Sequence, residues 1–257
     1  MPGPRRWAVA GIDLAWGERR PDGVCLLQGG PGGLTHIAHG LVRGDAELRQ
    51  WLRDHLPADR PALLCLDAPV VCPNRTGSRP VDRLTHRLFH RVQAAAHPAN
   101  RVLCARPLRV AAGLRRAGFS IATDWPSTPR ALVEVYPHPA TVRWFGLDRT
   151  IKYKRGPVAE RRREFARLQS LLRAWLGRHA PDLAAHPATC SLLREPWTKD
   201  TEDRTDALLC ALIGWQWATG GRRAMEILGD EQSGFIVLPK TKQPDRSATE
   251  FPPDSVR

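Results

Sequence analysis

The sequence lacks the long apolar segments that a membrane protein requires. Its longest apolar runs, such as residues 207–213, fall well short of the roughly 20 residues that cross a bilayer. The first ten residues contain no long apolar stretch followed by a small-residue cleavage site. We therefore expect a cytoplasmic protein that does not bind membranes.

Cysteine is scarce, and common phosphate-binding loops are absent. The six cysteines include no C-x-x-C pair and fit neither a disulfide framework nor a zinc knuckle, so they are predicted to be reduced and packed. The glycine-rich segment 29–35 has no Walker lysine, and no G-x-G-x-x-G motif joins a strand to a helix. A chain of 257 residues can nevertheless bury a core without cross-links.

Acidic residues are few beside basic ones, 26 against 39, and the net charge is +13. The excess lies in residues 75–130, with 11 Lys/Arg against 2 Asp/Glu, and in residues 143–178, with 11 against 3. Such blocks favour a nucleic-acid partner, because phosphates bind to positive surfaces. An alternative interpretation remains. Since 34 of the 39 basic residues are arginine, a bias in codon usage alone could produce the same composition.

Hydrophobic periodicity predicts one mixed α/β domain over residues 1–238, with a helical insertion at about 69–120 and a disordered tail at 239–257. Strands are expected at 7–12, 23–27, 34–39, 62–66, 131–136 and 234–238, and helices at 45–56, 81–96, 102–117, from 157 onward and at 201–218. This order is that of the RNase H-like fold, a mixed five-stranded sheet flanked by helices, whose first and fourth strands are adjacent.

Five carboxylates occupy the ends of these elements. Asp13 and Asp67 end the first and fourth strands, so they are expected to emerge together at the carboxyl edge of the sheet. Asp203 and Asp206 share one face of a first helical turn, and Glu134 lies on a strand. Carboxylates about 4 Å apart repel by about 4 kcal/mol per pair at an effective dielectric near 20, so the cluster indicates a bound Mg²⁺ or Mn²⁺.

Each carboxylate also fits a structural role. Asp13 and Asp67 could close turns, while Asp203 and Asp206 could favour the N-terminal end of the helix dipole. Glu134 could pair with a buried arginine. Their joint placement favours Asp13, Asp67 and Asp206 as functional residues.

Several motifs resemble the domain of unknown function 429 family, whose members are described as predicted RNase H-like nucleases. The motifs are GIDLAWG at 11–17, LDAPVVCPN at 66–74, RPVDR at 79–83, VEVYPHPA at 133–140, KYK at 152–154, TDALLCAL at 205–212 and GFIVLP at 234–239. The resemblance implies an RNase H-like fold and a site at Asp13, Asp67 and Asp206, with Glu134 as a further member. Asp203 and Asp206 are also similar to the helix-borne acids of Holliday-junction resolvases.

The motifs contain four candidate substrate-binding residues. Tyr136 and Tyr153 are the only two tyrosines, and Tyr136 could stack on a base, with His138 beside it. Lys152 and Lys154 could bind phosphate. An equally simple interpretation is that Tyr136 packs in the core and the lysines are solvated.

Together these patterns predict a divalent-metal-dependent nuclease that hydrolyses phosphodiester bonds. Asp13, Asp67 and Asp206 are predicted to hold the metal, with Asp203 as a further ligand. Asp203 or Glu134 would complete the metal shell or orient the water. Two alternatives remain: a nucleic-acid-binding protein of the same fold without catalysis, and an ATPase related to actin and sugar kinases. The ATPase would need a second glycine-rich, aspartate-containing phosphate loop, which the sequence does not show.

Overall fold

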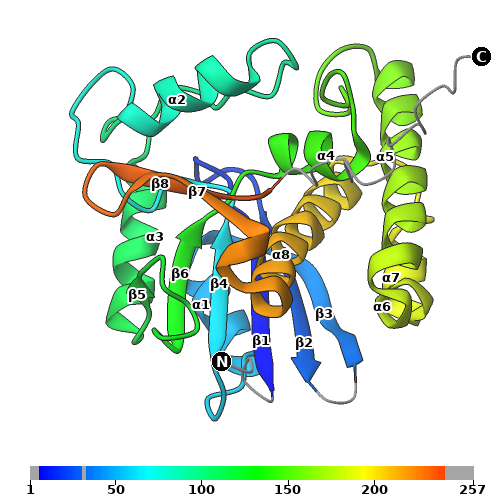
Figure 1. Ribbon diagram of the computed structural model, residues 1–257, viewed down its shortest axis with the longest axis horizontal. Helices are drawn as coiled ribbons and strands as arrows, with labels where there is room; N and C mark the ends of the chain where they lie inside the picture. The colour runs from blue at the N-terminus through cyan, green and yellow to red at the C-terminus, as the bar shows by residue number, and fades with distance from the viewer. Residues whose placement is uncertain (1–5, 31–32, 241–257) are drawn as a thin grey trace, which may run out of the picture.

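A computed structural model describes residues 6–30 and 33–240. A six-stranded sheet lies at its centre, in the order β3-β2-β1-β4-β6-β5 (Figure 1). The first three strands are antiparallel neighbours, whereas β1, β4, β6 and β5 run parallel. The strands of this sheet are β1 (Trp7–Asp13), β2 (Asp22–Gly30), β3 (Gly33–Val42), β4 (Ala62–Leu66), β5 (Ser120–Ile121) and β6 (Arg130–Glu134). The predicted pairing of the first and fourth strands is confirmed.

Helices cover both faces of the sheet, with α8 in front and α1 behind in the view of Figure 1. The helices are α1 (Gly44–His55), α2 (Pro80–Phe89), α3 (Ala105–Arg116), α4 (Pro137–Phe145), α5 (Val158–His179), α6 (Pro181–Ala185), α7 (Pro187–Leu192) and α8 (Lys199–Ala224). The mixed α/β class is thereby confirmed. No helix within the described residues is long and apolar enough to cross a membrane.

The prediction of five strands in the sheet is wrong by one strand. The extra strand, β5, is only two residues long, so it has no periodicity that a sequence pattern could reveal. The strand expected at 234–238 exists as β8 (Gly234–Pro239), but it forms a separate hairpin with β7 (Met225–Asp230), which was not predicted. A single bridge from Val135 to Val237 connects this hairpin to the main sheet.

Several helices differ from the predicted ones. The helix expected at 81–96 ends at Phe89, because Gln93 has a positive φ of 57° and the following chain bonds to other parts of the fold. The helix expected at 102–117 begins at Ala105, so Pro107 lies in its first turn, where a missing N–H costs little. Pro137 and Pro139 end the preceding strand as expected, but they also begin α4.

Glycines let α8 lie directly on the sheet. A Cβ on Gly11 would lie 2.0 Å from the Ala207 carbonyl oxygen, and one on Gly23 would lie 2.0 Å from the Asp203 carbonyl oxygen. Only glycine permits so close a backbone approach. The contact sets the first turns of α8 against the end of β1, which is where the candidate site lies.

The predicted insertion contains α2 and α3. Helix α2 packs on the β7–β8 hairpin, whereas the buried side chains of α3 join the main core. The predicted tail lies almost wholly outside the described residues, apart from Pro239 and Lys240. Helix α5 buries Phe165, Leu168, Leu172 and Leu176, and α8 buries Leu208, Ala211 and Leu212.

Candidate functional site at the carboxyl edge of the sheet

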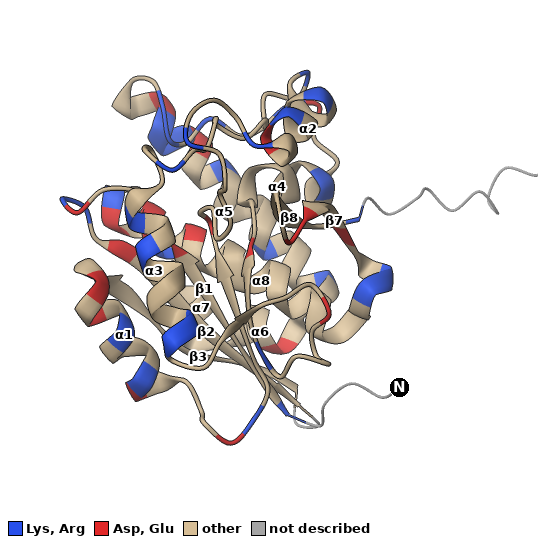
Figure 2. Ribbon diagram, turned by 90° about the vertical axis from the view of Figure 1, so that its left-hand side faces the viewer, with Lys and Arg blue, Asp and Glu red and all other residues tan. Residues whose placement is uncertain are grey.

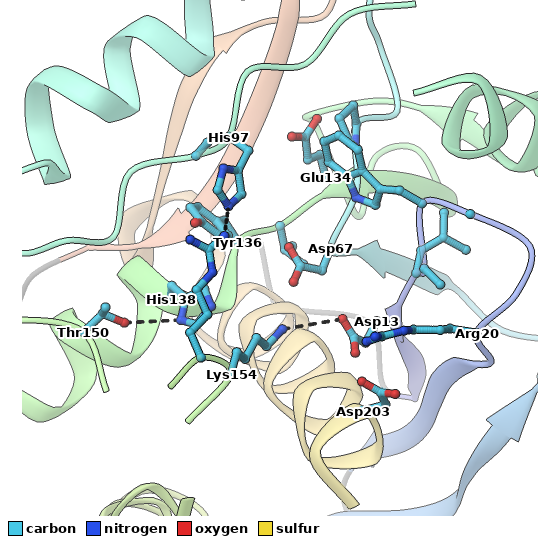
Figure 3. A pocket seen from close by; sticks show the side chains of 18 of the residues that line it. Asp13, Arg20, Asp67, His97, Glu134, Tyr136, His138, Thr150, Lys154 and Asp203 are labelled. Atoms are coloured by element: carbon cyan, nitrogen blue, oxygen red, sulfur yellow. Dashed lines mark hydrogen bonds and ion pairs between the residues drawn. The ribbon is translucent and has the colours of Figure 1, made fainter. Parts of the chain in front are cut away.

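Two adjacent strands bring Asp13 and Asp67 to the same edge. Asp13 is the last residue of β1, and Asp67 directly follows β4. The strands are parallel, with Ile12 opposite Leu66, and the Asp67 amide donates to the Ile12 carbonyl oxygen at 2.9 Å. Figure 3 shows both carboxyl groups facing the pocket. The structure therefore brings these two predicted residues together.

The first turns of α8 add Asp203 and Asp206. The helix begins at Lys199, and Thr198 caps it by accepting a hydrogen bond from the Thr201 amide. Asp203 lies on the pocket wall, and its carboxyl interacts directly with that of Asp13. Asp206 has no exposed surface and lies behind the wall. The two aspartates thus share a helix face but differ in their access to the pocket.

Lys154 lies among these carboxylates. Its Nζ is 2.7 Å from Asp206 Oδ2 and 4.0 Å from Asp13 Oδ1. The Tyr153 hydroxyl donates to the other oxygen of Asp206 at 2.6 Å. Burial lowers the pKa of Lys154, but Asp206 and Asp13 outweigh it and hold that pKa well above its usual value. Asp206 therefore positions a permanently charged ammonium group beside Asp13.

The neighbouring cations do not offset the effect of burial on the carboxyls of the pocket wall. Burial raises the pKa of Asp67 to about 7, against the lowering effect of Lys154, and Asp206 raises it further. Burial, more than its neighbours, also holds the pKa of Asp13 well above its usual value. Burial raises the pKa of Asp203 too, although Lys199 at 2.6 Å opposes this shift. A further cation bound near Asp13, Asp67 and Asp203 would lower their pKa values and favour the ionised form of all three carboxyls.

Glu134 lies on the pocket wall but is held in an ion pair. Both of its oxygens accept hydrogen bonds from the Arg79 guanidinium, at 2.6 and 2.7 Å. Arg79 also donates to Asp82, at 2.8 Å, and is almost completely buried. The structural alternative considered for Glu134, a pair with a buried arginine, is thus what this structure contains.

The pocket has a volume of about 970 Å³, and the four predicted substrate-binding residues all line it. The Tyr136 hydroxyl donates to a backbone carbonyl at 3.0 Å, so its ring and the acceptor side of its oxygen are what it can offer a ligand. His138 lies 3.2 Å from the Thr150 hydroxyl, and burial, with help from Lys154, lowers its pKa to about 4. Lys152 and Lys154 supply positive charge to the same wall.

A comparison with family models identifies the relatives of this chain. The model described as "Protein of unknown function (DUF429)" matches residues 11–228. The chain belongs to this family. The membership predicted from the motifs is therefore confirmed, although the GFIVLP motif lies beyond the matched residues. No curated protein matches the chain.

The sequence analysis missed several residues of the DUF429 pocket. Lys199 lies four residues before Asp203, a helical spacing that could have revealed their ion pair. Trp16 and Arg20 follow Asp13 in the loop after β1 and also line the pocket. Figure 3 shows Arg20 extending toward Asp13. No local pattern reveals that this loop folds back over the site.

Part of the basic excess is neutralised inside the fold. Figure 2 shows Lys and Arg on α2 and α3. Arg106 of α3, however, pairs with the buried Asp22 at 2.6 Å, and Arg109 pairs with Asp45 at 2.7 Å. Arg87 and Arg91 are exposed. The net charge of the block therefore overstates the positive surface that it offers.

Proposed function

We propose that this DUF429 protein is a divalent-metal-dependent nuclease of RNase H-like fold that hydrolyses phosphodiester bonds in nucleic acid. The observation that carries the proposal is the convergence of Asp13, Asp67 and Asp203 on one pocket, where burial raises the pKa of each carboxyl. Carboxylates that the fold leaves undercompensated in a pocket are typical of a site that binds a cation. The basic residues on the same pocket suit a phosphate substrate.

The two available carboxylates suit magnesium better than a metal ion whose ligands must all come from protein side chains. Among residues 6–30 and 33–240, no three His, Cys, Asp or Glu side chains are grouped so that they could hold a metal ion. Mg²⁺ is usually bound through one or two carboxylates and completes its shell with water and substrate phosphate. Asp13 and Asp67, at the ends of adjacent strands, would supply those two carboxylates.

A bound divalent ion would supply Lewis-acid stabilisation and an activated water. Asp203, beside Asp13 and outside the strand pair, would accept the proton of the attacking water. The oxygen of that water would bond to phosphorus as the bond from phosphorus to the leaving nucleotide oxygen breaks. Lys154, held by Asp206, would bind a phosphate oxygen and stabilise the charge that develops there.

Hydrolysis of labelled single-stranded, duplex, hybrid and branched substrates in the presence of Mn²⁺ tests this proposal. Asp13→Asn should reduce the rate at least about a hundredfold, because losing a group that stabilises developing charge costs several kcal/mol. Asp148→Asn, on an exposed carboxylate outside the pocket, is the matched control and should leave the rate unchanged. Activity that survives in Asp13→Asn would indicate a contaminating nuclease and contradict the proposal.

One observation favours a second candidate, a nucleic-acid-binding protein without catalysis. Lys154 already places an ammonium group among the carboxylates, so the site holds some compensating charge without a metal. Such a protein would bind nucleic acid equally well with Mg²⁺ or with a chelator, and it would not gain stability from Mg²⁺.

A further inference from the structure

The chain that follows α2 forms a fixed roof over one side of the pocket. This roof, residues 92–97, contributes Gln93, Ala95, Ala96 and His97 to the pocket wall. Three hydrogen bonds attach it to other residues that line the pocket. They run from the Thr150 amide to the Val92 carbonyl (2.7 Å), from the Tyr136 hydroxyl to the Ala95 carbonyl (3.0 Å), and between the Arg155 guanidinium and His97 Nε2 (2.9 Å). Figure 3 shows His97 and Tyr136 on this side of the pocket.

The loop after Asp13 forms a rim, residues 14–21, which also lines the pocket. The buried Arg106 holds this loop in place. Its guanidinium donates to the Ala15 carbonyl and, at 3.2 Å, to the Gly17 carbonyl. The same guanidinium pairs with Asp22, whose carboxyl also accepts the Ala15 amide at 2.9 Å. The rim is therefore held in place by a buried ion pair.

The braced rim exposes a large aromatic side chain. Trp16 is 37% exposed, and no other tryptophan of the described residues is as exposed. An indole at a pocket mouth is a stacking surface for a nucleobase, whatever the identity of the base. Arg20 lies on the same rim and extends toward Asp13, so it can bind a phosphate next to the stacked base.

The size of the pocket restricts what can reach the carboxylates. A volume of about 970 Å³ is at the upper end of the range for pockets that enclose small ligands. In RNA-guided effector complexes, by comparison, a continuous duplex is held along its length in a positively charged channel. Between a fixed roof and a braced rim, the carboxylates are accessible to one or two unpaired nucleotides.

We propose that the pocket binds an unpaired nucleotide of a nucleic-acid strand, with its base stacked on Trp16 and its phosphate directed between Arg20 and the carboxylates. The substrate class is therefore a single strand or a single-stranded overhang rather than an intact duplex. This inference rests on the proposed nucleic-acid partner and does not require that the site be catalytic.

Fluorescence anisotropy with fluorescein-labelled probes tests it on the full chain in EDTA, where cleavage is suppressed. The probes are a 12-nucleotide single strand, a blunt duplex of the same length and that duplex with a single-stranded overhang. The single strand and the overhang should bind at least about tenfold more tightly than the blunt duplex. Equal binding of the blunt duplex, or no binding of any probe, would overturn the inference.

Variants of the rim test the stacking contact. Trp16→Ala should weaken single-strand binding between about fivefold and a hundredfold, which corresponds to the loss of one base-stacking contact. Trp16→Phe should retain most of the affinity. Ile37→Ala, an exposed apolar side chain of β3 outside the pocket, is the control and should change nothing. Unchanged binding in Trp16→Ala would overturn the assignment.

One further outcome tests the strand itself, and two others separate this inference from the nuclease proposal. A mononucleotide that competes as strongly as the strand would overturn the assignment to a strand. Efficient cleavage and tight binding of blunt duplex would refute the single-strand preference and leave the nuclease proposal intact. Tight, Trp16-dependent binding of the single strand without cleavage of any substrate would support the inference and refute the nuclease.

Discussion

Glu134 ends β6 and Asp67 follows the neighbouring parallel strand β4, and both line the same pocket, but their charges are balanced in different ways. Glu134 receives two hydrogen bonds from Arg79. Among the described residues, the interactions that shift the pKa of Asp67 include no hydrogen bond. We call the first region, Arg79, Asp82 and Glu134, the paired centre. The second, Asp13 and Asp67, is the unpaired centre, in which Lys154 approaches Asp13 only to 4.0 Å.

This difference separates a structural role from a chemical one. In the paired centre, Arg79 links the end of β6 to the first turn of α2, so its carboxylates hold the insertion against the sheet. Burial raises the pKa of Asp13 and Asp67, and it also raises that of Glu134, so the two centres differ in their hydrogen-bonded arginine and not in the direction of the pKa shift. Proximity of carboxylates alone thus does not separate a structural pair from a candidate site.

The largest effect on stability is expected from breaking the paired centre. Arg79→Met should lower the free energy of unfolding by about 3–5 kcal/mol, because it leaves two buried carboxylates without their cation. Urea denaturation followed by circular dichroism measures this change. Arg87→Met, on the exposed face of the same helix, is the control and should stay within about 0.5 kcal/mol. Similar losses in both variants would show that the buried pair has no special role.

Magnesium should stabilise the unpaired centre by mass action. At a hundred times its dissociation constant, Mg²⁺ should add about 2.7 kcal/mol to the free energy of unfolding, seen as a rise in Tm. Asp13→Asn should abolish this gain, whereas Asp148→Asn should keep it. If wild-type protein showed no gain, the binding protein without catalysis would be the better description.

A smaller effect is expected from pH in the absence of metal. The pKa of Asp67 is about 7 in the folded chain against an ordinary value of 3.8, so the folded state binds its proton more tightly. The stability from this group is complete below about pH 4 and is lost as the pH rises through 7, by up to about 1.4 kcal/mol per pH unit.

Equilibrium unfolding in EDTA between pH 4 and pH 8 measures this slope. Asp67→Asn should flatten it, because an amide does not titrate. The variant should also be more stable than wild type at pH 8, where the native carboxylate is ionised in a buried site. The same slope in both proteins would place the pH dependence elsewhere and weaken the contrast between the two centres.

Much of the fold could be predicted from local patterns. The alternation and length of the apolar runs place Asp13, Asp67 and Asp203 at the ends of two strands and the start of a helix. Short elements could not be predicted in this way, because two residues in β5 provide no periodicity. The end of α2 could not be predicted either, because the chain beyond Phe89 makes a backbone hydrogen bond to a residue far along the sequence, from Thr150 to Val92.

The sequence by itself determined the membership in the DUF429 family, the α/β class and the strand ends that carry Asp13 and Asp67, because these depend on motifs and short-range patterns. Only the tertiary structure decided which carboxylates are paired. Arg79 lies 55 residues from Glu134, and Lys154 lies 52 residues from Asp206, yet each pair is in contact. Electrostatic balance depends on distance in space and on burial, and the order of residues along the chain specifies neither.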